Sequence, residues 1–561
     1  MEKIWLKSYP QGVPAEINPE TFQSVTQLLE DSFKKNAASP FSVCMDRWMT
    51  YKEVDDLSAA LGAWLQSQGL EPGARVAIML PNLPQFSVTM AAILRAGYTC
   101  VNVNPLYTPR ELEHQLRDSG ATTIVILENF ATTLTEVLAK TPIKRVVLAT
   151  MGDLLGAMYG KWITFAVRNL KKIVPAYSFS TANGLQVTPF NQAIAAGKRM
   201  TLKPGNSTLD SIAFLQYTGG TTGLSKGAVL THRNIVAAVL QGEAWFTPAM
   251  SRVGDVRKIN SIAALPLYHI FALNLSLLSI RWGAYMTLVP NPRDFTGFVN
   301  TLKKRPFHML PAVNTLFNAL LQHPDFKTVD FSNLCVSQAG GMAASEGTAR
   351  NWLAVTGCPM IEGWGMSETV AMGTNNPVNN KEFTGTIGLP LPGILIAIKD
   401  EAGNDVAQGE SGEICIKGPN VMTGYYNQPV ENKNAFTSDG YFKTGDVGIM
   451  DKRGYTKIID RLKDMIIVSG FNVYPNELEN TVSLCPGVLE CAVIGVPDDK
   501  AGEAIKLFII KNDANLSEED VKAYCRQNLT GYKMPKYIVF RDDLPKTNVG
   551  KILRRELRAG K

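Results

Sequence analysis

Residues 217–227, with the sequence YTGGTTGLSKG, combine residue types that bind phosphate groups. The glycines allow backbone N–H groups to turn toward an anion, the threonines and the serine add hydroxyl donors, and Lys226 adds a positive charge. The chemistry that this composition indicates is the binding of the phosphates of a nucleotide.

The stretch is not a Walker A loop. That motif has Gly before its lysine and Ser or Thr after it, whereas Ser225 and Gly227 flank Lys226. Residues 212–217 and 228–230 have the pattern of strands, so we expect the loop to join two strands rather than to begin a helix. A flexible surface loop is the alternative, and the lysine and the two strands argue against it.

Four further motifs follow in order, at 363–369 (GWGMSET), 441–446 (YFKTGD), 460–464 (DRLKD) and 545–555 (PKTNVGKILRR). Together with the loop they resemble the adenylate-forming superfamily of acyl-CoA synthetases and luciferases, over nearly the whole chain. Stretches at 102–121, 265–273 and 468–477 resemble the bacterial long-chain fatty acid:CoA ligases in particular.

The resemblance implies a pair of half-reactions. A fatty acid and ATP form acyl-AMP and pyrophosphate, and CoA then takes the acyl group and releases AMP. The implied protein is a long-chain fatty acid:CoA ligase that feeds fatty acid uptake and β-oxidation, with Mg²⁺ as cofactor. Two alternatives stay open: an adenylate-forming ligase for another carboxylic acid or a carrier acceptor, and a binding protein without chemistry.

The resemblance also assigns roles to residues. The expected catalytic residues are Lys226, Glu368 and Lys551, and Lys551 is expected to bridge the carboxylate and the α-phosphate. Glu368 and Thr218 are the expected Mg²⁺ ligands. The residues expected to bind ATP are Tyr217, Thr218, Gly219, Gly220, Thr221, Thr222, Gly223, Leu224, Ser225, Lys226, Gly227, Gly340, Gly341, Trp364, Asp446 and Arg461.

The remaining expected sites concern the acyl chain, CoA and domain motion. His269, Leu273 and Gly340 are expected to contact the fatty acid, although His269 is equally explained as a core histidine. The expected CoA contacts are Gly470 and Phe471. Lys463 is the expected hinge, about which rotation exchanges Lys551 for the loop around Gly470.

The chain departs from the usual family pattern at a few positions. Trp364 stands where tyrosine is usual beside adenine, Ser367 replaces threonine, and residues 338–343 lack a proline that often follows the glycines. Tyr441 stands in place of a usual tryptophan. Tryptophan stacks at least as well as tyrosine, so these changes concern nucleotide affinity rather than the class of reaction.

The elements that must position these residues are of two kinds. Strand and helix patterns alternate from residue 75 to residue 127, with a capping box at Thr108 and Glu111, and this predicts a parallel sheet. Residues 385–459 show alternating strands and turns, typical of an antiparallel, barrel-like subdomain. We therefore expect an α/β protein with two doubly wound subdomains and a barrel-like subdomain in residues 1–460, and a small mobile α+β lid domain in residues 461–561.

Composition narrows the class of protein. The 561 residues are 45% apolar with a net charge of +6, which does not indicate a nucleic-acid binder. The eight cysteines and five histidines show no metal-binding spacing, and residues 1–12 show no signal peptide, so we expect reduced thiols and a cytoplasmic location. A homodimer is an open alternative.

Two apolar stretches bear on membranes. Residues 261–280 are uncharged but contain Pro266, His269 and Asn274, and we interpret them as a buried wall. Residues 161–174 predict an amphipathic helix with Trp162 and Ile163 on its apolar face. This helix either lies peripherally on the inner membrane or packs on its own domain.

Overall fold

The phosphate-binding candidate lies at one edge of a seven-stranded sheet. The computed structural model describes residues 2–180, 184–218, 225–469, 471–498, 501–547 and 552–560. The sheet has the strand order β7-β6-β5-β3-β4-β8-β9, and every neighbouring pair is parallel except β8 and β9. Its strands are β3 (Arg75–Met79), β4 (Thr99–Asn102), β5 (Thr123–Leu127), β6 (Arg145–Ala149), β7 (Gln186–Pro189), β8 (Ile212–Tyr217) and β9 (Gly227–Thr231).

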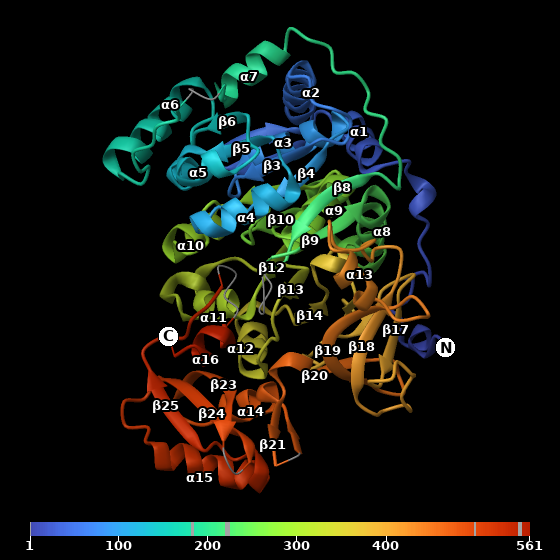
Figure 1. Ribbon diagram of the computed structural model, residues 1–561, viewed down its shortest axis with the longest axis vertical. Helices are drawn as coiled ribbons and strands as arrows, with labels where there is room; N and C mark the ends of the chain where they lie inside the picture. The colour runs from blue at the N-terminus through green and yellow to red at the C-terminus, as the bar shows by residue number, and fades with distance from the viewer. Residues whose placement is uncertain are drawn as a thin grey trace.

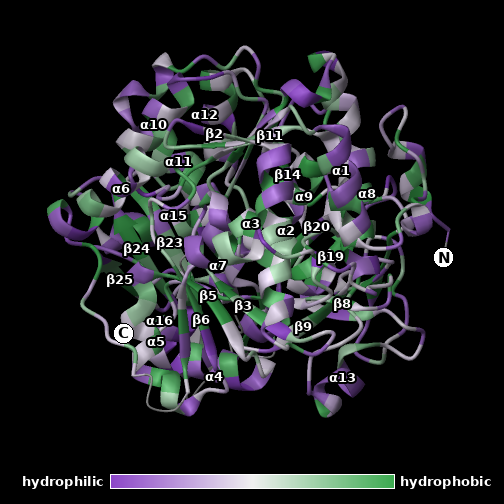
Figure 2. Ribbon diagram, turned by 90° about the horizontal axis from the view of Figure 1, so that it is seen from above, coloured by the Kyte–Doolittle hydropathy of each residue, from purple (hydrophilic) through white to green (hydrophobic). Residues whose placement is uncertain are grey.

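Helices alternate with these strands, which confirms the predicted winding. They are α2 (Tyr51–Ser67), α3 (Pro84–Arg95), α4 (Pro109–Ser119), α5 (Ala131–Val137) and α7 (Phe190–Gly197). Helix α4 begins as predicted, because the backbone N–H of Glu111 donates to Oγ1 of Thr108 and the Glu111 carboxylate accepts from the backbone N–H of Thr108. Gly120 ends the helix at φ +62°, a conformation that suits glycine. Figure 2 shows β3, β5 and β6 in hydrophobic colours, as expected for strands covered on both faces.

A second sheet has nine strands in the order β16-β15-β14-β13-β12-β10-β11-β1-β2. Its six inner strands run parallel, and antiparallel strands stand at both ends. The strands are β1 (Pro40–Cys44), β2 (Arg47–Thr50), β10 (Asn260–Ala263), β11 (Tyr285–Leu288), β12 (Met309–Ala312), β13 (Val336–Ala339), β14 (Met360–Trp364), β15 (Thr374–Asn375) and β16 (Leu389–Pro390). The helices of this half are α1 (Val25–Lys35), α8 (His232–Met250), α9 (Ile270–Trp282), α10 (Phe295–Lys303), α11 (Asn314–Gln322) and α12 (Glu346–Thr356).

The apolar run at 261–280 forms part of β10 and most of α9, and nearly all of its side chains are buried. This confirms its interpretation as a wall of the core. Within the part of the chain that is described, no helix is both long and apolar enough to cross a bilayer. All eight cysteines are buried free thiols.

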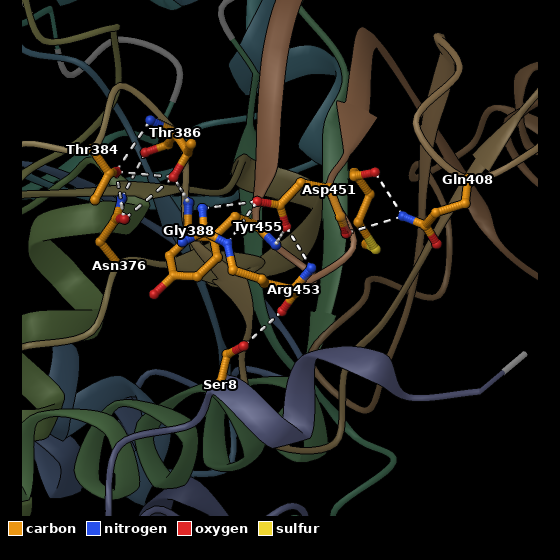
Figure 3. A network of polar contacts seen from close by, with 10 residues as sticks. Ser8, Asn376, Thr384, Thr386, Gly388, Gln408, Asp451, Arg453 and Tyr455 are labelled. Atoms are coloured by element: carbon orange, nitrogen blue, oxygen red, sulfur yellow. Dashed lines mark hydrogen bonds and ion pairs between the residues drawn. The ribbon is translucent and has the colours of Figure 1, made fainter.

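The alternating strands that follow form a four-stranded antiparallel sheet, made of β17 (Leu395–Lys399), β18 (Gly412–Lys417), β19 (Phe442–Met450) and β20 (Thr456–Arg461). Among the described residues the pairing runs from β17 to β20 as an open path. Figure 3 shows how the turn between β19 and β20 is fixed: Oδ1 of Asp451 accepts from the backbone N–H groups of Arg453 and Tyr455, and the hydroxyl of Ser8 donates to the carbonyl of Arg453. The N-terminal segment is thus hydrogen-bonded to the turn between β19 and β20.

The last part of the chain lies apart from the two large sheets in Figure 1, below β20. It contains β21 (Ile466–Val468), β22 (Phe471–Val473), β23 (Val488–Asp498), β24 (Gly502–Lys511) and β25 (Tyr537–Arg541), with α14 (Pro475–Val482), α15 (Glu518–Asn528) and α16 (Arg554–Arg558). These elements enclose their own hydrophobic core. The architecture is α+β, as predicted.

The predicted amphipathic helix differs from expectation. Residues 161–174 contain the end of α6 (Ala157–Phe165) and a π-helix (Ala166–Leu170). Trp162 and Leu170 are exposed, whereas Ile163 is half-buried against the core, so the predicted apolar residues are divided between an exposed set and a set that packs on the domain. Trp162 and Ile163 already differ within α6, and the wider turn of the π-helix breaks the 3.6-residue period for the residues that follow.

Candidate functional site

The two ends of the glycine-rich loop close against each other. Strand β8 ends at Tyr217 and β9 begins at Gly227, and the two pair in antiparallel fashion, so the loop joins strands as predicted. The backbone N–H of Thr218 donates to the carbonyl of Lys226 over 3.0 Å, and the hydroxyl of Ser225 donates to the carbonyl of Thr218 over 2.5 Å. Gly219, Gly220, Thr221, Thr222, Gly223 and Leu224 lie outside the described residues.

Helix α4 holds the base of this loop. The hydroxyl of Tyr217 donates to Oδ2 of Asp118 over 2.5 Å, and Nε2 of His114 lies 2.8 Å from the carbonyl oxygen of Ser225. Burial raises the pKa of Tyr217, so its hydroxyl stays protonated as a donor. The sequence interpretation missed His114 and Asp118, although their spacing of four residues places both on one face of α4.

Lys226 is already paired with a carboxylate. Its Nζ lies 2.6 Å from Oε2 of Glu431, in α13 (Pro429–Ala435), and 5.4 Å from the ring centroid of Tyr425. Neither Tyr425 nor Glu431 was predicted, because neither lies in a motif that the sequence singled out. The lysine therefore stands between an aromatic face and an acidic group.

Glu368 is a buried carboxylate in a short 3₁₀ helix (Ser367–Thr369). Its Oε1 accepts a hydrogen bond of 2.7 Å from the hydroxyl of Tyr425, and burial raises the pKa of Glu368. Tyr425 thus contacts the candidate phosphate-binding lysine with its ring and the candidate metal ligand with its hydroxyl.

The protein side chains at this site fit Mg²⁺ only when phosphate oxygens of a bound nucleotide complete its coordination. The described residues contain no cluster of three or more His, Cys, Asp or Glu side chains that could hold a metal ion. Mg²⁺ commonly binds through one or two carboxylates together with phosphate oxygens and water, and the single buried Glu368 fits that mode. Thr218, the other predicted ligand, lies at the base of the loop directly after β8.

Three of the predicted nucleotide residues meet at one carboxylate. Nε1 of Trp364 donates to Oδ2 of Asp446 over 2.9 Å, and Nε of Arg461 lies 3.0 Å from Oδ1 of the same residue. Asp446 and Arg461 are paired across β19 and β20, and Asp446 is buried. Each carboxylate oxygen has two lone-pair sites, so both oxygens keep one for a further donor. The indole also packs closely on Gly373, where an added Cβ would lie 2.6 Å from Cε3 of Trp364.

The predicted acyl-chain residues surround the start of α9. His269 is the N-cap of this helix, and its Nδ1 accepts from the backbone N–H of Phe271 over 3.3 Å. Leu273 is fully buried in α9. At Gly340 an added Cβ would lie 3.0 Å from the Phe271 ring, and Gly341 has φ +77°. A small cavity between β10 and α9 is lined by Ser261, Ile262, Ala263, Leu265, Ala272, Leu275, Ser276, Met286 and Pro311.

The predicted hinge is fastened on both sides to the C-terminal elements. Oδ2 of Asp460 accepts from the backbone N–H of Asn476 over 2.8 Å. The carboxylate of Asp464 lies 3.2 Å from Nη1 of Arg554 and 3.0 Å from Nη2 of Arg558. Lys463 lies between these two anchored aspartates and is exposed.

Of the other predicted C-terminal residues, one is described. Phe471 is more than half exposed and stacks on Tyr532 with ring centroids 4.8 Å apart. Gly470 and Lys551, predicted for CoA binding and for catalysis, lie outside the described residues.

Comparisons with known proteins extend over the full chain. The family model described as AMP-binding enzyme matches residues 29–426, and the one described as AMP-binding enzyme C-terminal domain matches residues 477–551. A long-chain-fatty-acid–CoA ligase of Yersinia pestis is 47% identical over 100% of this chain and 98% of its own. The protein of the same name from Escherichia coli O6:H1 is also 47% identical, with the same coverage. The solved structure of ATP-bound MatB from Rhodopseudomonas palustris is 28% identical, covers 96% of this chain and 99% of its own, and superposes with a TM-score of 0.80.

Proposed function

Because the chain belongs to the AMP-binding enzyme family, we propose that it joins a long-chain fatty acid to CoA in an ATP-dependent reaction through an acyl-AMP intermediate. The observation that carries the proposal is the 47% identity, over essentially full length, to long-chain-fatty-acid–CoA ligases. Two groups of contacts support a nucleotide site. Trp364 and Arg461 both bind the carboxylate of Asp446. Tyr425 contacts Lys226 with its ring and Glu368 with its hydroxyl.

In the first half-reaction, a carboxylate oxygen of the fatty acid attacks the α-phosphorus of ATP and pyrophosphate leaves. The loop at 217–227 would bind the β and γ phosphates, with Lys226 neutralising their charge. Asp446 would accept from the ribose hydroxyls, held in place by Arg461. Glu368 would hold Mg²⁺, which supplies neutralisation of phosphate charge when bound. Lys551 would pair with the carboxylate and the α-phosphate as they approach.

In the second half-reaction, the CoA thiol attacks the acyl carbonyl carbon and AMP leaves with the former carboxylate oxygen. We assign residues 1–460 to the AMP-binding domain and residues 461–561 to the lid domain, with the hinge near Lys463. Rotation there would remove Lys551 from the site and bring the loop around Gly470 and Phe471 to it. The hydrogen bond from the backbone N–H of Asn476 to Asp460 and the ion pairs of Asp464 with Arg554 and Arg558 lie on either side of Lys463 in the chain.

The fatty acid would reach the enzyme at a membrane surface. Met158, Trp162, Phe165, Leu170 and Ile173, on α6 and the segment after it, are each more than half exposed. Lys161, Lys171 and Lys172 are exposed among them. Exposed apolar side chains bordered by lysines suit a bilayer with anionic lipid, so we assign this face to peripheral membrane contact.

The test of this contact is binding to vesicles that contain phosphatidylglycerol. We expect salt-sensitive binding that is lost in Trp162→Glu with Leu170→Glu, while activity on a soluble acid is kept. The matched control is Leu484→Glu with Leu489→Glu, which adds the same charge at two exposed apolar positions of the C-terminal domain. Equal loss of binding in both double variants would contradict the assignment.

The test of the proposed function is ATP-dependent thioester formation, measured by mass spectrometry. A ladder of saturated acids from short to long and an aromatic acid are offered, with CoA or a pantetheinylated carrier protein as acceptor. We expect acyl-CoA, AMP and pyrophosphate in equal amounts, with the highest kcat/KM for long chains. A preference for an aromatic acid, or transfer to the carrier protein alone, would contradict the proposal.

A further inference from the structure

The phosphate-loop lysine forms an ion pair with a residue that has no role in the scheme above. Nζ of Lys226 and Oε2 of Glu431 are 2.6 Å apart, and their side chains are 35% and 48% exposed. The lysine that is proposed to bind phosphate is therefore already in direct contact with a carboxylate.

Backbone hydrogen bonds hold this carboxylate beside the loop. The backbone N–H of Val229, on β9, donates to the carbonyl of Gly424, and the N–H of Tyr426 donates to the carbonyl of Gly227. The Asn432 side chain accepts from the N–H of Tyr425 over 2.6 Å and donates to its carbonyl over 2.9 Å. Glu431 precedes Asn432 directly, so its position follows from a segment that is bonded to the end of the phosphate loop.

The same segment contacts the other half of the candidate phosphate site. The ring of Tyr425 lies beneath Nζ of Lys226, and its hydroxyl donates to Glu368. A triphosphate bound between Lys226 and Glu368 would bring several negative charges close to Glu431. Two anions would then compete for one ammonium group, and like charges at short range repel each other.

We propose that Glu431 is an internal competitor of the triphosphate. In the nucleotide-free protein it neutralises Lys226, and the β and γ phosphates of MgATP displace it. This inference rests on the proposed function, because it takes the loop to bind those two phosphates. It makes Glu431 a positioning residue that sets the affinity for ATP without touching the reacting atoms.

The test compares MgATP and AMP binding by titration calorimetry in the wild type, Glu431→Gln and Glu401→Gln. The amide in Glu431→Gln keeps the shape and removes the charge. We expect about fivefold tighter MgATP binding, which converts to about 1 kcal/mol, the upper range for a partly exposed ion pair. AMP affinity should stay unchanged, because AMP lacks the phosphates that displace the carboxylate.

The control Glu401→Gln removes one charge from an exposed turn and should match the wild type for both ligands. Unchanged or weaker MgATP binding in Glu431→Gln, or an equal gain for AMP, would overturn the inference. If the wild type forms no acyl-CoA, the proposed function is refuted. If Glu431→Gln then still shows the expected difference between MgATP and AMP binding, this inference is supported. A wild type that forms acyl-CoA, with no such difference in the variant, would refute this inference alone.

Discussion

Asp446 is the residue at which the predicted nucleotide contacts converge. The indole N–H of Trp364 and the guanidinium of Arg461 each bind one of its carboxylate oxygens. The sequence predicts that Trp364 stacks on adenine, and in the structure its indole N–H donates to the carboxylate that is proposed to bind the ribose. An aromatic face and a ring N–H can serve these two purposes at once.

Replacing Trp364 with phenylalanine separates the two purposes. The variant Trp364→Phe keeps an aromatic face but removes the donor to Asp446, so we expect MgATP binding to weaken by about 1 kcal/mol, typical of one hydrogen bond. Titration calorimetry measures this, with Trp48→Phe, a half-exposed tryptophan on β2, as control. An affinity equal to that of the wild type would remove Trp364 from the positioning of Asp446.

Glu362, in the middle of β14, predicts a pH dependence of stability. Burial raises the pKa of its carboxyl to about 8, so the folded protein keeps this proton where the unfolded chain has lost it. Stability should therefore fall as pH rises from the ordinary glutamate pKa to about 8, by about 1.4 kcal/mol per pH unit. The variant Glu362→Gln cannot lose a proton and should escape this loss.

Urea unfolding at pH 6 and pH 8 measures the effect. The free energy of unfolding of Glu362→Gln relative to the wild type should rise by about 2 kcal/mol between the two values. Parallel behaviour of the two proteins would show that the carboxyl ionises at its ordinary pKa.

Motif residues could be found from the sequence, and their partners could not. Lys226, Glu368 and Asp446 lie in short runs of distinctive composition. Tyr425 and His114 reach the same site through tertiary contacts between segments that are distant in the chain. No local pattern of residues encodes such contacts.

At the scale of elements, local signals predicted the winding of the first sheet well. The capping box at Thr108 and the turn at Gly120 act within one helix, and both are confirmed. The pairing of β1 with β11, for instance Ser42 with Met286, joins residues far apart in the chain and left no local signal. The π-helix after α6 was also missed, because the apolar pattern was interpreted with a constant helical period.

An ion pair with a buried carboxylate anchors the segment that follows α6. Arg168, in the π-helix, donates to the carboxylate of Glu128, whose side chain is fully buried, over 2.6 Å and 2.9 Å. The side-chain amide of Asn129 also donates to the carbonyl of Ile173. These bonds fasten residues 168–173 to residues 128–129, directly after β5.

Removing the guanidinium should loosen this element. In Arg168→Ala a buried carboxylate loses its partner, and we expect a local loss of about 1–3 kcal/mol, discounted because the arginine is half exposed. Hydrogen exchange of residues 157–173 should quicken, while the seven-stranded sheet stays protected. The control Lys171→Ala removes an exposed cation and should exchange like the wild type. Equal exchange in Arg168→Ala would contradict the anchoring role.

At the scale of the whole molecule, the proposed reaction needs two arrangements of the C-terminal domain. Asp464, with Arg554 and Arg558, binds the segment after Lys463 to helix α16. Helix α16 begins three residues after Lys551 in the chain, so these contacts join the segment after the proposed hinge to the element that follows the proposed catalytic lysine in the sequence. The motifs predict that the hinge precedes the catalytic lysine in the chain. The contacts of Arg554 and Arg558 with Asp464 could not be predicted, because they join residues about ninety positions apart.

The two half-reactions should therefore be separable by mutation. Lys551→Ala should form acyl-AMP roughly 10² to 10³ times more slowly, typical of the loss of a preorganised donor, yet convert supplied acyl-AMP and CoA to thioester. Lys463→Pro and Gly470→Leu should form acyl-AMP and stall. Single-turnover assays of each half-reaction measure this, with circular dichroism to verify folding. Equal damage to both half-reactions in all three folded variants would refute the two-conformation scheme.

The central claim is that the fatty acid is activated by bonding its own carboxylate oxygen to AMP. The most direct measurement follows ¹⁸O from a doubly labelled long-chain fatty acid during one turnover with ATP and CoA. The proposed route predicts that one labelled oxygen appears in AMP, one stays in the thioester, and none enters pyrophosphate. Unlabelled AMP together with labelled phosphate or pyrophosphate would contradict the acyl-AMP route.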